Sequence, residues 1–180
     1  MANLQIHEQY IEYVKEAVAL VGEEAKILKA DCFNEARNVF PVVPLYRNAI
    51  CVEINQDLVN EAKEKGINAV LGDIRNLSFE DESFDLVVDL STIDHIWEVE
   101  KVIKEYNRVL RPKGILLIVC WFNTTGKIIE TRDEYGMQYF FLLDDFKKVL
   151  LKFFDIINEE PLPQTKKNEI FLYKFLCKKK

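Results

Sequence analysis

Short apolar runs that alternate with amphipathic segments are the feature that most constrains the fold of this 180-residue chain. The runs at 49–52, 67–71, 84–88 and 115–119 are rich in β-branched residues, and the segments between them carry apolar side chains at helical spacing. This alternation is typical of parallel β-α-β units. A fifth run, 25–30, reads as the first strand, and residues 1–22 read as an N-terminal amphipathic helix. The sequence therefore predicts an α/β fold.

Acidic residues stand directly after three of the predicted strands. Glu53 follows the run 49–52, Gly72 and Asp73 follow 67–71, and Asp89 follows 84–88. Ligands of open parallel sheets bind beyond the carboxyl ends of the strands. We therefore expect these acids at one edge of the sheet, as part of a nucleoside-binding site.

Length and charge narrow the class of protein. The chain is long enough for one domain, 1–180, and its net charge of -6 argues against a nucleic-acid partner. No apolar run approaches the roughly 20 residues of a membrane-spanning helix, and no signal pattern stands at the N-terminus. Four cysteines without C-x-x-C spacing suit reduced thiols and a cytoplasmic protein. No metal site is visible.

The C-terminal third has a different pattern. Residues 123–137 are polar and irregular, and we predict that 123–143 is a variable loop on the substrate side of the sheet. Two further strands, about 153–158 and 170–177, are joined by a short turn. Parallel neighbours need a longer crossover, so the sheet should end in an antiparallel hairpin.

The order of these elements resembles the class I S-adenosylmethionine-dependent methyltransferases, in particular the small-molecule type. The resemblance is carried by LGDIRNLSFEDESFDLVVD and RVLRPKGILLIV and extends over about residues 23–178. It implies a Rossmann-like three-layer sandwich with a seven-stranded, mostly parallel sheet, strand order 3-2-1-4-5-7-6, and strand 7 antiparallel. It also implies S-adenosylmethionine as cofactor and S-adenosylhomocysteine as product.

The same resemblance assigns roles to the residues at the strand ends. Glu53 would hold the ribose hydroxyls, while Asp73, with the backbone of Ile74, would bind the adenine amino group. Asp89 and Leu90 would line the pocket near the sulfonium, and the adenine would pack on Ile54. The alternative for each acid is a solvated strand end or a helix cap.

The first motif departs from the family pattern. The family expects an acid followed by G-x-G-x-G, whereas this chain has ILKADCFNEA, with Lys29 at the acid position. Asp31, Phe33 and Glu35 take the glycine positions. In one interpretation Asp31 replaces the acid, and Asn34 or Glu35 binds the amino-acid end of the cofactor. In the other, Phe33 fills the site and the cofactor cannot bind.

Candidate catalytic residues lie in the segment STIDHI. Asp94 and His95 could accept a proton from the methyl acceptor, although a histidine at such a junction is often a capping or packing residue. Tyr135 and Met137 are candidates for the wall of an acceptor pocket. The carboxylate cluster that a metal-assisted transfer would need is not visible.

These patterns lead to a predicted function and two alternatives. We predict methyl transfer from S-adenosylmethionine to a small-molecule acceptor. The first alternative is an inactive methyltransferase-like domain that binds a partner. The second, a nucleotide-dependent oxidoreductase, lacks the required G-x-G-x-x-G. Pro41 and Pro44 shorten the first crossover, which could leave one sheet face thinly covered and favour a homodimer.

Overall fold

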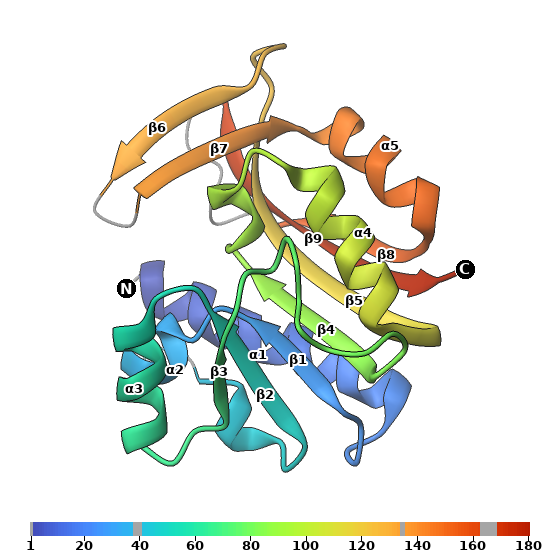
Figure 1. Cartoon of the computed structure of the whole chain (residues 1–180). Coiled ribbons are helices and arrows are strands. Elements are labelled where there is room, and N and C mark those ends of the chain that lie inside the picture. The colour runs from blue at the N-terminus through green and yellow to red at the C-terminus, as the bar shows by residue number, and fades with distance from the viewer. Residues whose placement is uncertain (1, 38–40, 134–135, 163–168) are drawn as a thin grey trace.

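A twisted sheet with helices on both faces forms the body of the computed structural model, which describes residues 2–37, 41–133, 136–162 and 169–180 (Figure 1). The strands are β1 (Ile27–Ala30), β2 (Ala49–Glu53), β3 (Ala69–Leu71), β4 (Phe84–Leu90), β5 (Leu110–Asn123), β6 (Ile129–Asp133), β7 (Gly136–Leu142), β8 (Phe154–Pro161) and β9 (Ile170–Lys179). The α-helices are α1 (Ala2–Val21), α2 (Phe33–Arg37), α3 (Gln56–Glu64), α4 (Val99–Val109) and α5 (Leu143–Phe153), with 3₁₀ turns η1 (Val43–Leu45) and η2 (Ile93–His95).

Strand pairing confirms the predicted topology. The sheet runs β3-β2-β1-β4-β5 with parallel neighbours, and β9 then pairs antiparallel with both β5 and β8. β8 and β9 thus correspond to strands 6 and 7 of the predicted order 3-2-1-4-5-7-6. Parallel strands that share one direction bring their carboxyl ends to the same edge, which is where the acids after β2, β3 and β4 lie.

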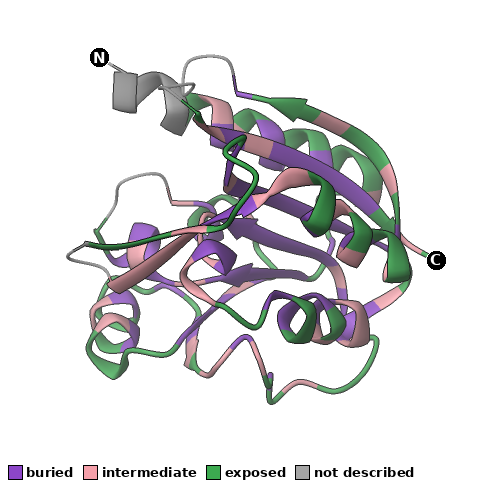
Figure 2. Cartoon of the chain, turned by 90° about the horizontal axis from the view of Figure 1, so that it is seen from above, coloured by how far each residue is buried: buried purple, intermediate pink, exposed green. Residues whose placement is uncertain are grey.

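Alternating side chains divide the core into two layers. In β5, Ile115, Leu117 and Val119 face α1, α2 and α3, whereas Leu116 and Ile118 face α4 and α5. The central strands β1, β2, β4 and β5 consequently lie buried between two helical layers (Figure 2). The short crossover after β1 does not leave its face bare, because α1, α2 and η1 all contribute buried residues there. The expectation of a homodimer, which rested on a thinly covered face, therefore has no structural support.

The segment 123–143, predicted as an irregular loop, contains a β-hairpin instead. β6 pairs antiparallel with β7, and the end of β7 adds to the sheet beside β5, where Phe122 pairs with Phe141. The polar residues of β6 concealed this strand from the sequence pattern, since a solvent-facing edge strand needs few apolar side chains. The hairpin extends beyond the sheet on the side of η2 (Figure 1).

None of the helices in the described ranges is long and apolar enough to cross a membrane.

Candidate functional site

A cavity of about 480 Å³ opens at the carboxyl edge of the sheet, and we call it the edge cavity. Its size lies within the range of pockets that hold one small molecule. Its wall comes from the ends of β1, β2 and β3, from η2 and the residues after it, and from β7. The lining residues are Asp31, Val52, Glu53, Ile54, Gly72, Asp73, Ile74, Arg75, Thr92, His95, Ile96, Trp97, Glu98, Met137 and Tyr139.

Glu53 ends β2 and is held in place by backbone N–H groups. Its Oε2 accepts from the amide of Cys32 at 3.0 Å and its Oε1 from the amide of Asn55 at 2.9 Å. An ionised carboxylate has about four acceptor positions. Glu53 therefore keeps acceptor capacity on both oxygens, and its side chain is fixed in orientation before any ligand arrives.

Asp73, beyond β3, has its carboxylate engaged by Arg75. The guanidinium donates through Nη2 at 2.6 Å and through Nε at 3.0 Å, and the Arg75 amide donates at 2.8 Å. These hydrogen bonds lower the pKa of Asp73 from its usual range. Arg75 also donates to Glu98 at 2.9 Å, so it bridges the end of β3 and the start of α4. A ligand amino group would have to share Asp73 with this guanidinium.

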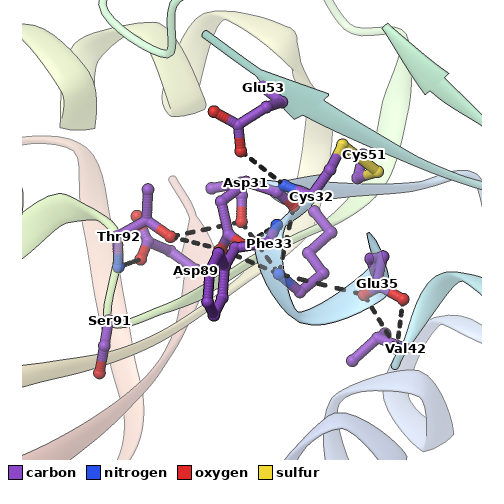
Figure 3. Close-up of polar contacts among 12 residues, drawn as sticks. Asp31, Cys32, Phe33, Glu35, Val42, Cys51, Glu53, Asp89, Ser91 and Thr92 are labelled. Carbon is purple, nitrogen blue, oxygen red and sulfur yellow. Dashed lines mark hydrogen bonds and ion pairs between the residues drawn. A yellow bond between two sulfur atoms is a disulfide. The ribbon is translucent and has the colours of Figure 1, made fainter. Parts of the chain in front are cut away.

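The polar side chains of the first loop form hydrogen bonds within the loop and with Thr92. Asp31 has a φ of 68°, the left-handed conformation that favours glycine, at the first glycine position of the family motif. Its Oδ1 accepts from the Phe33 amide at 2.9 Å. Its Oδ2 accepts from Lys29 Nζ at 2.9 Å and from Thr92 Oγ1 at 2.6 Å. The loop thus keeps the backbone shape expected of a glycine while using a carboxylate (Figure 3).

Lys29 and Glu35 form the buried part of this arrangement. The Lys29 side chain is fully buried and pairs with Asp31, and its Nζ lies 4.0 Å from Glu35 Oε1. The Glu35 carboxylate accepts from the amides of Val42 and Val43 at the start of η1, at 2.9 to 3.2 Å. Burial raises the pKa of Glu35, and the positive charge of Lys29 opposes that shift. Glu35 therefore joins α2 to η1 and does not face the edge cavity.

Cys32 and Cys51 differ from the sequence prediction. The sequence indicated reduced thiols, whereas the structure joins these two residues in a disulfide with a Cα–Cα distance of 5.5 Å. Cys51 lies in the middle of β2 and Cys32 lies just after the end of β1, its parallel neighbour, so the pairing of these strands brings residues 19 apart in sequence into contact. Cys120 and Cys177 are free and buried.

Asp89 and Leu90, at the end of β4, lie under the cavity and not on its wall. Asp89 is fully buried and accepts from the amides of Thr92 and Ile93 and from the Tyr106 hydroxyl, the last at 2.7 Å. Burial raises the pKa of this carboxyl to about 6, with the hydrogen bonds opposing the shift. Asp89 consequently fixes η2, the turn that carries His95.

Asp94 and His95 are adjacent in sequence but differ in exposure. Asp94 is fully buried, and burial raises the pKa of its carboxyl to about 7. Within the described part of the chain only its Oδ2 has a hydrogen-bond partner, Gln138 Nε2 at 3.3 Å. His95 lines the edge cavity, and its Nδ1 lies 2.8 Å from the Met137 carbonyl oxygen. Because a carbonyl oxygen only accepts, Nδ1 must carry the proton. In the neutral imidazole Nε2 is then the basic nitrogen.

The cavity wall includes five of the nine predicted cofactor residues, namely Asp31, Glu53, Ile54, Asp73 and Ile74. Asn34 and Glu35 in α2, and Asp89 and Leu90 at the end of β4, are buried and do not line the cavity. Met137 is on the wall, and Tyr135 lies outside the described residues. The sequence pattern did not predict that Arg75, Trp97 and Tyr139 line the cavity. The position of Trp97, a bulky residue shortly after the end of a predicted strand, was a signal that could have indicated it. The described residues contain no cluster of metal-ligating side chains.

Comparisons with known proteins agree with this geometry. A family model described as "Methyltransferase domain" matches residues 34–118. The demethylmenaquinone methyltransferase of Staphylococcus haemolyticus is 30% identical over 106 residues, which are 56% of this chain and 44% of that protein. The chain thus matches less than half the length of this curated relative.

Solved structures share the fold at low sequence identity. The [4+2]-cyclase SpnF superposes with a TM-score of 0.77 at 16% identity, covering 96% of this chain and 80% of the cyclase. The 1,6-didemethyltoxoflavin-N1-methyltransferase of Burkholderia thailandensis, solved with S-adenosylhomocysteine, gives 0.70 at 14% identity, covering 94% and 77%. A cyclase and a methyltransferase share this architecture, so the fold alone does not identify the chemistry.

Proposed function

Because the chain belongs to the class I S-adenosylmethionine-dependent methyltransferases, we propose that it transfers the methyl group of S-adenosylmethionine to a small-molecule acceptor. The observation that carries the proposal is the edge cavity with Glu53 fixed at the end of β2. S-adenosylmethionine is the cofactor typical of the family. The proposal includes a cytoplasmic location.

The residues on the wall fit this cofactor. Four carboxylates and one guanidinium are among the described lining residues, which suits a ligand with a sulfonium and an ammonium group. Gly72 lets the chain after β3 pack closely against Val52, since a Cβ there would lie 2.8 Å from Val52 Cγ2. Glu53 would hold the ribose hydroxyls as a bidentate acceptor. Asp73, shared with Arg75, and the Ile74 backbone would face the adenine.

Two interpretations of the first loop were open, and the cavity lining favours the first. Phe33 would have to stand across the edge cavity to block it, but its side chain is not among the residues that line the cavity. Asp31, by contrast, is on the wall, with its carboxylate tied to Lys29 and Thr92. An inactive methyltransferase-like domain therefore has less support than an enzyme.

The chemistry requires little of the protein beyond placement. The cofactor, when bound, would supply an electrophilic methyl group on a sulfonium. The protein contributes proximity and orientation. We assign His95 the role of general base. Its Nε2 would take the proton from the acceptor O–H or N–H group while the acceptor oxygen or nitrogen bonds to the methyl carbon. The Met137 carbonyl holds the ring in the tautomer that leaves Nε2 free. Asp94, buried and off the cavity wall, supports η2 instead of contacting the acceptor.

Calorimetric titration with S-adenosylhomocysteine tests the proposal. We expect micromolar binding to the wild type and a loss of at least about tenfold in Glu53→Ala, because a charge-assisted bidentate hydrogen bond is removed. Glu24→Ala is the matched control, an exposed acid at the opposite end of the sheet, and should bind like the wild type. A folded wild-type protein that does not bind would refute the proposal.

A further inference from the structure

A second cavity, which we call the helix cavity, lies beside the first. It has a volume of about 460 Å³ and is bounded by the start of α4, by α5 and by the end of β7. Its wall is mainly apolar, with Trp97, Val99, Ile128, Phe141, Phe146 and Val149. The Trp97 side chain is 56% exposed and Ile128 is 36% exposed. Exposed large apolar side chains around a hollow are typical of a binding site.

The two cavities are neighbours, because Trp97 and Glu98 line both. The Trp97 ring packs at a tilt against Tyr139, 5.4 Å between centroids, and Tyr139 stacks on Phe141 at 6.0 Å. These aromatic rings therefore form one continuous wall from the edge cavity to the helix cavity. A pocket of either volume suits one small ligand. If the cofactor fills most of the edge cavity, the bulk of the acceptor must lie in the helix cavity next to it.

The charges at the rim of the helix cavity disfavour an anionic ligand. The carboxylates there already have cationic partners: Glu98 pairs with Arg75 and Lys101, Glu100 with Lys152, and Asp145 with Lys148. A carboxylate or phosphate that entered the apolar interior would find no cation among the described lining residues that is not already paired. Burying an uncompensated charge is strongly unfavourable. A neutral molecule incurs no such penalty.

We propose that the helix cavity binds the ring system of an uncharged aromatic methyl acceptor, which lies against Trp97 and extends its reactive group into the edge cavity. This inference rests on the proposed function and names its substrate class. Aromatic rings gain from offset or edge contacts with Trp and Phe beyond the burial of their area. The same arrangement makes residues of α5 determinants of acceptor specificity, although they lie outside the edge cavity.

Paired titrations test the inference, with 1-naphthol as a neutral probe and 1-naphthoate as its anionic analogue. Each is titrated into the wild type saturated with S-adenosylhomocysteine. We expect 1-naphthol to bind at least about tenfold more tightly than 1-naphthoate, since the anion must lose its hydration without a partner. Equal affinity for the two probes, or no binding of 1-naphthol, would overturn the inference.

Variants of α5 locate the bound probe. Val149→Trp fills the helix cavity and should lower 1-naphthol affinity at least about tenfold while S-adenosylhomocysteine binds as before. Leu151→Trp, an exposed position on the same helix, is the matched control and should change neither. If Val149→Trp does not fold, Ile128→Glu, at the cavity mouth, serves the same purpose.

The two titrations fail independently. Unchanged 1-naphthol affinity in a folded Val149→Trp or Ile128→Glu variant would place the probe elsewhere and refute the helix-cavity assignment, whatever the result with the cofactor product. If the folded wild type does not bind S-adenosylhomocysteine, the proposed function is refuted instead. A titration of 1-naphthol into the protein alone would then still test whether the helix cavity binds a neutral aromatic ring.

Discussion

The first loop and the rim formed by the ends of β2 and β3 are both rich in charged residues, yet they use them differently. In the loop, Lys29, Asp31 and Glu35 bind one another and nearby backbone amides. At the rim, Glu53 accepts from only two amides and faces an open cavity. Charged residues near a site are therefore ligand candidates only when some of their hydrogen-bonding capacity is left. In the loop, charged side chains that pair with one another stand where the family has glycines. At the rim, the Glu53 carboxylate still has acceptor capacity for a ligand.

Removing the cation of the loop should have the largest effect on stability. Lys29→Met leaves Asp31 and Glu35 as partly uncompensated buried acids, so we expect the free energy of unfolding to fall by about 3–5 kcal/mol. Urea denaturation measures it. Lys26→Met, an exposed lysine just before β1, is the control and should change stability little. A loss in Lys29→Met as small as that of the control would mean that the network is not structural.

Glu35→Ala separates the two regions most cleanly. The variant loses the acceptor for the Val42 and Val43 amides, and we expect about 2 kcal/mol of destabilisation. Because Glu35 is not on the cavity wall, affinity for S-adenosylhomocysteine should stay within about twofold of the wild type at a temperature where both are folded. A large loss of affinity would instead assign Glu35 to the cofactor.

Asp94, a buried acid beneath the rim, makes the free energy of unfolding depend on pH. Its folded pKa is raised to about 7 by burial, above its value in the unfolded chain. Between about pH 4 and 7 the folded state thus binds a proton that the unfolded state has lost, so this carboxyl contributes most at low pH and its contribution is lost as pH rises through 7.

Asp94→Asn removes this titration. The variant should gain stability relative to the wild type by about 2–3 kcal/mol between pH 5 and pH 8, measured as the change in the difference between their unfolding free energies. Glu64→Gln, which removes an exposed carboxylate on α3, is the control with which the change in Asp94→Asn is compared. A pH-independent difference for Asp94→Asn would show that the buried carboxyl does not titrate in this window.

Asp73→Asn should have the smallest effect. Its carboxylate is already bound by Arg75, so replacing it should weaken S-adenosylhomocysteine binding by only about threefold, well below the loss in Glu53→Ala. Calorimetry of the two variants side by side measures the ratio. A larger loss in Asp73→Asn than in Glu53→Ala would reverse the order of importance that the hydrogen bonds assign.

The fold was largely predictable because its signals are local or shared with a family. β-branched runs marked the strands, and the family resemblance supplied their order, which the pairing confirms. The β6–β7 hairpin was missed because Glu130, Thr131 and Arg132 give an edge strand no apolar pattern. Edge strands are stabilised by pairing more than by burial, and pairing partners are not visible in a single sequence.

The site was predictable only in its outline. Acids at strand ends could be located from the sequence, but their partners could not. Asp73 is engaged by Arg75 through loop geometry, and Glu35 turns toward amides seven and eight residues away. Asp73 stands in a turn, where neither strand nor helix periodicity fixes the side-chain direction, and Glu35 stands in the five-residue helix α2, which is too short to give a periodic pattern. Asp31 has a left-handed φ at a glycine position of the family motif, and the sequence pattern did not predict that backbone shape.

Amide hydrogen exchange with and without S-adenosylhomocysteine tests the central claim most directly, because it reads the rim and the loop in one measurement. We predict that the cofactor product slows exchange most at residues 53–55 and 72–75, which border the edge cavity, and changes it least at 42–45, which Glu35 already holds. Protection centred on 42–45, or no protection in either segment, would contradict the account.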